Sequence, residues 1–397
     1  MTRSTVAGPA LRRRLFLAGA AGAALLPAGR RVHAQPGPER LAYVGSYTPE
    51  GKGITLWRVN TGNGAMALVG TFETENPSWI TLDPQGRVLY AVNENEPEGG
   101  VTAFAVDRSS GTLTRINSVS SRGKWPCHIS VHPSGKFAFA ANYGTGTVAV
   151  LPIQANGALG EASDVVGDPG PPAPAQAADS PAGQTAPSDH AGPHMHMVQA
   201  DPQGRFIIVN DAGRDRILRY TLDLASGRLT PAAVPPVAAE PGSAPRHFVF
   251  HPQGRILYDL QEQDGMVTAY DYDPATAGMK ERQSVSVLPP GFAGSFLASE
   301  LGISPDGHFL YAATRLHDAI SVLSVAEDGR LTRIGEAWTR ADYPRSFTLS
   351  PDGSMLFACN QRGNAVTAFR VNRSQGALDF VGQYAPVGSP ACMVFLG

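Results

Sequence analysis

Four side chains in the central part of the sequence would support acid–base and anion-binding chemistry if the fold brought them together. They are His196, Arg246, Glu262 and Arg315. An arginine guanidinium is a planar fork that fits carboxylates and phosphates, while glutamate and histidine are the usual proton carriers in enzymes. Converging on one site, these groups would suit an anionic, oxygen-rich small molecule.

These residues keep fixed distances from a four-residue turn that recurs along the chain. Its second residue is Pro, which pre-sets φ, and its fourth is Gly, which suits a type I turn. The turns recur regularly, with one longer interval that contains an insertion. We expect each turn to be the tip of a β-hairpin. The copies are Asp83–Gly86, His132–Gly135, Asp201–Gly204, His251–Gly254, Ser304–Gly307 and Ser350–Gly353.

Each turn is flanked by short segments with the composition and alternation of β-strands. In the first copy a strand is expected at 79–82, a second at 88–92, a third at 101–106 and a fourth at 113–116. A period of about 50 residues with four strands is typical of a propeller blade. The turns therefore predict six blades.

The two ends of the chain supply a further blade. Residues 391–395 look like a first strand, while residues 41–44, 54–57 and 67–70 look like a second, third and fourth strand. Joining them would close the ring and leave no exposed sheet edge. The sequence therefore predicts an all-β fold, a seven-bladed β-propeller with four-stranded blades and a split N-/C-terminal blade.

The candidate residues occupy two aligned positions in each blade. One lies six residues before the turn proline and the other ten residues after it, so both fall at the same end of the hairpin, the expected channel mouth. His194 lies on the strand face of His196, and Glu94, Arg345 and Gln361 would extend the pocket as substrate-binding residues. The first position holds Ser78, Cys127, His196, Arg246, Ser299 and Arg345, and the second holds Glu94, Tyr143, Ala212, Glu262, Arg315 and Gln361.

Other interpretations of these charges stay open at this point. They would also be explained by ion pairs between blades that line a water-filled channel. His194 and His196 are two residues apart, but no carboxylate at a recognisable spacing joins them. The sequence also has no Gly-rich phosphate loop and no H-E-x-x-H motif. We therefore expect neither a metal nor a cofactor.

Residues 1–34 are interpreted as an export signal and not as part of the fold. Basic residues at 12–14 precede an apolar segment at 15–26, which is too short to span a bilayer. The basic residues match the twin-arginine pattern, and residues 32–34 form a small-x-Ala cleavage site. We expect a periplasmic or extracellular protein in which residues 35–397 form one propeller domain that is not inserted in the membrane.

Composition restricts the partners. A net charge of −2 and a pI near 6.6 give no broad basic field for nucleic acid. The cysteines, Cys127, Cys359 and Cys392, lie in apolar strand-like segments and are expected to be buried free thiols. An insertion at 167–192, rich in Pro, Ala, Ser and Gly, predicts a surface loop. Because it ends at a histidine cluster, it is also a candidate lid or rim. The oligomeric state stays open.

Several segments resemble the lactonase family of seven-bladed propellers, which includes 6-phosphogluconolactonases and fungal carboxy-muconate lactonising enzymes. The resemblance covers essentially the whole mature chain. It implies a metal-independent site that maps onto His196, Arg246, Glu262 and Arg315, with His194 as the rival for the histidine role. The segments are Pro-His-Met-His at 193–196, Pro-Arg-His at 245–247, Leu-Tyr-Asp-Leu-Gln-Glu at 257–262 and Tyr-Ala-Ala-Thr-Arg at 311–315.

The resemblance also implies chemistry at a sugar or carboxylic-acid lactone. In the resulting hypothesis Glu262 or His196 activates a water, while Arg246 and Arg315 hold the substrate anion or the oxyanion. Phosphogluconate metabolism is cytoplasmic, so the export signal favours an unphosphorylated aldonolactone. The alternatives are cycloisomerisation of a muconate-like diacid at the same site, and an exported propeller that binds a partner without catalysis.

Overall fold

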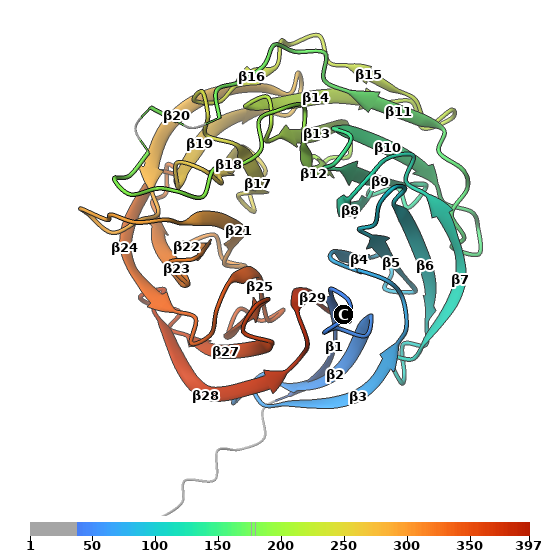
Figure 1. The fold of residues 1–397 in the computed structure, drawn as a ribbon. Coiled ribbons are helices and arrows are strands. Elements are labelled where there is room, and N and C mark those ends of the chain that lie inside the picture. Colours follow the sequence, from blue (N-terminus) through green and yellow to red (C-terminus); the bar gives the residue numbers. More distant parts are fainter. Residues whose placement is uncertain (1–37, 176, 179) are drawn as a thin grey trace, which may run out of the picture. The chain divides into compact units, whose positions relative to one another are not determined.

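The computed structural model describes residues 38–397, except residues 176 and 179. The export signal expected at residues 1–34 lies outside the described residues. Within them, the regular elements are β-strands that form seven sheets around a central axis (Figure 1). This confirms the expected seven-bladed β-propeller. The described residues contain no helix that is long and apolar enough to cross a lipid bilayer.

In every blade the strands are antiparallel, and they are named below in order from the axis outward. Blade 1 contains β4 (Ile80–Leu82), β5 (Val88–Asn93), β6 (Gly100–Val106) and β7 (Leu113–Ser120). Blade 2 contains β8 (Pro126–Val131), β9 (Phe137–Asn142), β10 (Thr147–Pro152) and β11 (Asp164–Gly167). Blade 3 contains β12 (Met195–Ala200), β13 (Phe206–Asp211), β14 (Arg216–Leu222), β15 (Leu229–Pro231) and β16 (Val237–Ala238).

The remaining blades each have four strands. Blade 4 contains β17 (Pro245–Phe250), β18 (Ile256–Gln261), β19 (Met266–Asp273) and β20 (Gly278–Ser286). Blade 5 contains β21 (Leu297–Ile303), β22 (Phe309–Arg315), β23 (Ala319–Val325) and β24 (Leu331–Trp338). Blade 6 contains β25 (Pro344–Leu349), β26 (Met355–Asn360), β27 (Ala365–Val371) and β28 (Leu378–Pro386). Blade 7 contains β29 (Pro390–Phe395), β1 (Glu39–Ser46), β2 (Ile54–Asn60) and β3 (Met66–Phe72).

Blade 7 closes the ring as the sequence predicts. The C-terminal strand β29 pairs with the N-terminal strand β1, with Tyr43 opposite Val394, and the two strands lie side by side in Figure 1. Blade 3 differs from the expected four strands. Its outermost place is divided between β15 and β16, which pair with opposite ends of β14.

The recurring turns are the tips of the inner hairpins, as predicted. In blade 1 the Gly86 amide donates to the Asp83 carbonyl at 2.9 Å, and Gly86 has a φ of 63°. This left-handed conformation costs glycine little but strains residues with a Cβ. The requirement explains why each copy ends in glycine.

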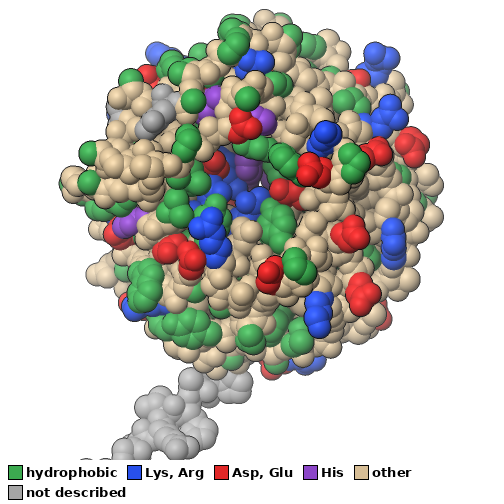
Figure 2. Space-filling model, viewed as in Figure 1, with side chains coloured by type: hydrophobic (Ala, Val, Ile, Leu, Met, Phe, Trp, Pro, Cys, Tyr) green, Lys and Arg blue, Asp and Glu red, His purple; other side chains and the backbone are tan. Residues whose placement is uncertain are grey.

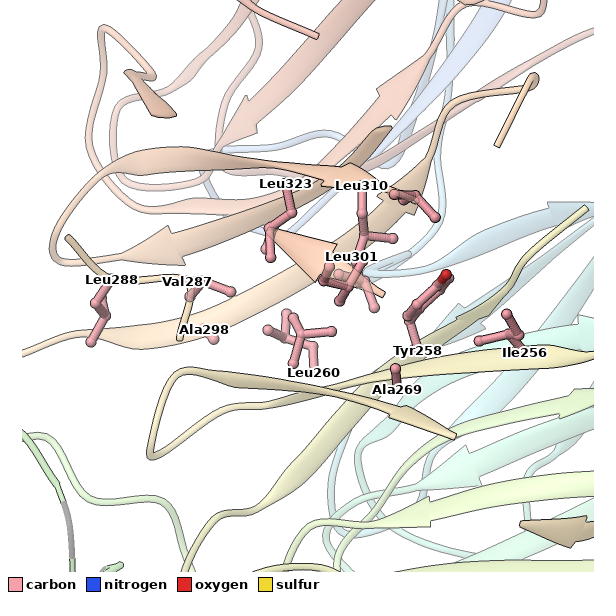
Figure 3. Close-up of a cluster of buried hydrophobic side chains, with 14 of the residues drawn as sticks. Ile256, Tyr258, Leu260, Ala269, Val287, Leu288, Ala298, Leu301, Leu310 and Leu323 are labelled. Atoms are coloured by element: carbon pink, nitrogen blue, oxygen red, sulfur yellow. The ribbon is translucent and has the colours of Figure 1, made fainter. Parts of the chain in front are cut away.

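Apolar side chains of neighbouring blades pack against each other. In Figure 3, Tyr258 and Leu260 of blade 4 face Leu301 and Leu310 of blade 5 in one such buried cluster. The three cysteines are free and buried, as predicted from their apolar surroundings. Packing between the blades therefore supplies the cores that hold the inner strands around the axis.

A repeated tyrosine hydrogen bond supplements this packing. Four second-position strands carry a buried tyrosine whose hydroxyl donates to a glycine carbonyl of the next blade. In the blade 4 pair, a side chain at Gly329 would collide with Ile256, so the close approach requires glycine. The pairs are Tyr43 with Gly111 at 2.7 Å, Tyr90 with Gly157 at 3.0 Å, Tyr258 with Gly329 at 2.9 Å and Tyr311 with Gly376 at 3.1 Å.

Truncation of one inter-blade side chain should destabilise the ring. Leu310 is fully buried. We expect Leu310→Ala to lower the free energy of unfolding by about 2 to 5 kcal/mol through lost burial and a residual cavity. Urea unfolding followed by tryptophan fluorescence measures this change.

The matched control is Leu68→Ala, because Leu68 on β3 is 57% exposed. This surface substitution should change the free energy of unfolding by no more than about 0.5 kcal/mol. Equal effects of the two changes would contradict the packing described here.

Candidate active site

The central hollow visible in Figure 2 gathers basic, acidic and histidine side chains on one face of the ring. The hairpins explain this gathering, because an inner strand begins where its neighbour ends. Pro245 at the start of β17 pairs with Gln261 at the end of β18. Arg246 and Glu262 therefore meet at the same end of blade 4, as their sequence spacing predicts.

A β-bulge directs the first of the two aligned positions toward the axis. In blades 2 to 6 the pairing register shifts across this residue, so that it has no direct partner on the next strand. A bulge re-aims side chains and ends regular pairing. The bulged residues are Cys127, His196, Arg246, Ser299 and Arg345.

Glu262 lies between two arginines from neighbouring blades. Its Oε2 accepts from Arg246 Nε at 2.8 Å and from Arg315 Nη2 at 2.5 Å. Arg246 also donates to the Ser299 carbonyl, and Arg315 donates to the Ala298 carbonyl at 3.1 Å. The side chains of both arginines are at most 6% exposed. The cluster carries a net charge of +1 and is largely buried.

Electrostatics keep this carboxylate ionised. Burial alone would raise the pKa of Glu262, but Arg315 and Arg246 outweigh it and bring the pKa down to about 2. A carboxylate with so low a pKa binds a proton weakly at neutral pH. Glu262 is therefore better suited to hold the two guanidiniums than to take a proton from water.

His196 lies in the same mouth and has a free ring nitrogen. Its imidazole contacts the rings of Tyr143 and His247, with centroids 5.8 and 5.1 Å away. Its buried Nδ1 has no hydrogen-bond partner among the described residues. Burial, followed by the nearby Arg246, lowers the pKa of His196 well below its ordinary value. The imidazole is thus neutral at physiological pH.

His194 is differently placed. Its ring stacks on Tyr143 at 4.4 Å, and its Nδ1 lies 2.8 Å from the Tyr143 carbonyl. Its Nε2 lies 3.3 Å from a carboxylate oxygen of Asp189. Both nitrogens of His194 therefore face protein groups, which separates the two histidines that the sequence left as rivals.

Arg345 and Glu94 form a second charged group in the mouth. Arg345 Nη2 lies 3.7 Å from Glu94 Oε2, which also accepts from the Tyr47 hydroxyl at 2.6 Å. The Arg345 guanidinium lies 5.1 Å from the centroid of the Tyr47 ring and makes no side-chain hydrogen bond within the described residues. Gln361 follows β26, and its buried Oε1 also has no partner there. The Arg345 guanidinium and Gln361 Oε1 therefore keep hydrogen-bonding positions that no described residue fills.

The insertion contributes to the rim of the site. Ser188 donates its hydroxyl to Glu262 Oε1 at 2.9 Å, and its amide donates to the Gln263 side chain. Gln184 Nε2 donates to the Phe296 carbonyl at 2.8 Å, which holds the segment against blade 5. The sequence placed this segment near the histidines but offered no reason to single out Ser188.

A deeper layer lies one residue beyond the bulges. His247 Nδ1 is 2.9 Å from Glu300 Oε1, and His247 also contacts the rings of Trp79 and His128. Burial raises the pKa of Glu300 to about 8 and lowers the pKa of His247 well below its ordinary value. Trp79, His128, His247 and Glu300 each lie five residues before a turn proline, so this spacing is the sequence signal for the deeper layer.

The described residues contain no group of three His, Cys, Asp or Glu side chains arranged to hold a metal ion. The arrangement supplies a neutral imidazole, two guanidiniums fixed by a carboxylate, and further hydrogen-bonding groups around one hollow. Such a set is suited to activating water and stabilising an oxyanion.

The comparison with known proteins agrees with this chemistry. A family model described as "Lactonase, 7-bladed beta-propeller" matches residues 41–395. The chain belongs to the lactonase family. Because this match spans nearly all of the propeller and the relatives named below match over nearly their full lengths, the protein is a lactonase enzyme, as the sequence resemblance implied.

Three relatives represent the similarity. The lactonase is 30% identical over 362 residues to 6-phosphogluconolactonase of Bacillus subtilis, covering 90% of this chain and 98% of the relative. It is 29% identical over 363 residues to 6-phosphogluconolactonase of Formosa agariphila, covering 89% and 99%. The structure of a periplasmic gluconolactonase of Pseudomonas aeruginosa matches with a TM-score of 0.83 and 28% identity, covering 91% and 99%.

The Glu262 cluster predicts a specific dependence of the lactonase's stability on pH. The folded-state pKa of about 2 is below the ordinary value of 4.5. The cluster therefore stabilises the fold above the ordinary pKa and loses this contribution as the pH falls toward the folded-state pKa. Glu262→Gln should lower the free energy of unfolding at pH 7 by about 3 to 5 kcal/mol. The difference from wild type should shrink between pH 5 and about pH 3.

Urea unfolding at several pH values measures this difference. Glu327→Gln is the control, since Glu327 lies in an exposed turn of blade 5. A difference between wild type and Glu262→Gln that stays constant from pH 7 to pH 3 would rule out the proposed electrostatic origin.

Proposed function

We propose that this lactonase hydrolyses an unphosphorylated sugar-acid lactone at the channel mouth. The observation that carries the proposal is the Arg246–Glu262–Arg315 cluster beside the unpartnered nitrogen of His196. The arginines offer charge to an oxyanion, and the imidazole offers a base.

The reaction follows from these roles. The His196 imidazole takes a proton from a water whose oxygen attacks the lactone carbonyl carbon. Arg246 and Arg315 stabilise the oxyanion of the tetrahedral intermediate. The ring C–O bond then breaks, the leaving alkoxide takes the proton from the imidazolium, and the open hydroxy acid is released. Glu262 positions both guanidiniums and limits their mutual repulsion, and we therefore assign the base role to His196.

The Arg345–Glu94 pair in the mouth favours a neutral polyhydroxy substrate. Arg345 and Glu94 together carry no net charge, and a carboxylate beside a guanidinium suits hydroxyl groups, which donate to one and accept from the other. The pair offers a phosphate group no net positive charge, and the Glu94 carboxylate would repel it. The named substrate of the Pseudomonas relative, a gluconolactone, has this chemistry.

The expected export signal supports the same substrate class. Residues 1–34 have the pattern of a twin-arginine signal, and the Pseudomonas relative is named periplasmic. We infer that this lactonase acts in the periplasm, where phosphorylated sugar acids of cytoplasmic metabolism do not reach it. A muconate-like diacid is less favoured, because Glu262 already neutralises one of the two guanidinium charges that its carboxylates would need.

Catalysis should depend on His196 and on the paired arginine cluster. With glucono-δ-lactone in a pH-stat assay corrected for spontaneous opening, His196→Gln should lower kcat at least about 100-fold, the usual share of a general base. Arg246→Ala and Glu262→Gln should each slow opening at least about tenfold. Activity of wild type should persist below pH 6.5, since the pKa of His196 is lowered.

The control for this assay is His308→Gln at an exposed hairpin tip, which should keep wild-type activity. Full activity of His196→Gln would exclude His196 as the base, and the absence of opening by wild type across a panel of aldonolactones would exclude the proposed substrate.

Glu94 should determine the preference against phosphate. Glu94→Gln removes the repelling charge, so the ratio of kcat/KM for 6-phosphogluconolactone over gluconolactone should rise at least about tenfold, which corresponds to about 1.4 kcal/mol. Glu96→Gln, an exposed neighbour, serves as the control. An unchanged ratio would show that Glu94 does not face the distal end of the substrate.

A further inference from the structure

The outer edge of blade 3 contains a pocket that the channel chemistry does not use. It is open to solvent and has a volume of about 760 Å³, which is within the size range of small-molecule sites. It lies where β15 and β16 leave the middle of β14 without a continuous partner strand. The end of β11 and the start of the insertion form the opposite wall.

The local sequence explains why the pocket exists. After β15, the Ala232 amide bonds to the Arg219 carbonyl at 2.9 Å, and the chain then leaves the edge of the sheet until β16. Residues 233–236 read Ala-Val-Pro-Pro, and proline has no amide hydrogen with which to continue a ladder. The departure leaves a hollow with mainly apolar walls, which include Val166, Leu218, Tyr220, Pro231, Val234 and Pro236.

Two arginines line this apolar hollow. Arg219 is 5% exposed and donates to the Pro235 carbonyl, while its Nε and Nη1 have no partner among the described residues. Burial of a guanidinium without an anion is unfavourable, because the charge loses water and gains no compensating partner. Within the described residues, Arg219 has no ion pair.

Arg216 lies nearer the solvent, with a side chain 25% exposed. Its Nη1 is 3.6 Å from Asp168 Oδ1, which is also the acceptor for the Gly170 amide. It makes no side-chain hydrogen bond within the described chain, and a Cβ at Gly170 would collide with its guanidinium. The two arginines and the single carboxylate of Asp168 leave the pocket with a net positive charge.

We propose that this pocket is a second binding site, for a carboxylate attached to an apolar body. The carboxylate would bind Arg216, where free guanidinium donors face an opening, and the charge of Arg219 would add to the attraction. The apolar body would cover Val166, Pro231 and Val234, which are partly or fully exposed, and gain from removal of these surfaces from water. A polyol would leave those apolar walls in contact with water, and a cation would be repelled by the two guanidiniums. The site is independent of the proposed lactone chemistry.

Isothermal titration calorimetry with purified mature protein tests this site. Decanoate and 2-naphthoate represent an alkyl and an aryl body, and decanol is the uncharged comparison. We expect one equivalent of at least one carboxylate to bind, with decanol at least tenfold weaker. Arg216→Gln should weaken carboxylate binding at least tenfold while leaving lactone opening unchanged, and Arg228→Gln, an exposed arginine of the same blade, should bind as wild type does.

Arg219→Met provides a second variant that keeps most of the volume of the buried side chain and removes its charge. It should also weaken carboxylate binding. If it fails to fold, Arg216→Gln alone decides the question, because that side chain is partly exposed and its loss should be tolerated. Absence of binding by both carboxylates, equal binding of decanol, or unchanged binding by Arg216→Gln would overturn the proposal.

Discussion

The sharing of one carboxylate by two buried guanidiniums is the interaction on which the channel mouth depends. Burial and the charge of Arg315 bring the pKa of Arg246 down to about 10, so the two cations are costly to hold at the axis of an apolar ring. Glu262 offsets the cost of burying both cations, because its Oε2 accepts a hydrogen bond from each guanidinium. The same contact fixes the carboxylate in its ionised form.

The positions of these groups follow from the backbone and not from a dedicated loop. A bulge at the start of the inner strand turns one residue of each of five blades toward the axis, and the hairpin brings the end of the second strand beside it. The strands themselves are held by packing between blades and by tyrosine hydroxyls that reach the next blade. A rigid ring therefore positions the chemistry, as catalytic precision requires.

The sequence predicted much of this because the repeat is explicit. The turn prolines mark the hairpins, and the spacing of Arg246 and Glu262 from the proline of their turn predicts that these two residues are neighbours. The contact of Ser188 with Glu262 was not predictable, because it depends on the path of an irregular insertion. The sequence also left the roles of Glu262 and His196 exchangeable, since pKa shifts depend on burial and on charges from other blades. The split outer edge of blade 3 depends on how a short proline-containing segment leaves the sheet, which periodicity does not report.

The insertion between β11 and β12 touches two places that are otherwise separate. It begins at the pocket wall with Asp168 and Gly170 and reaches the rim of the channel mouth with Ser188. Its length and composition are not constrained by the repeat, since the blades pair without it. Evolution can therefore exchange this single segment as a module and alter the range of molecules accepted at the rim, while the propeller that performs the chemistry is inherited intact.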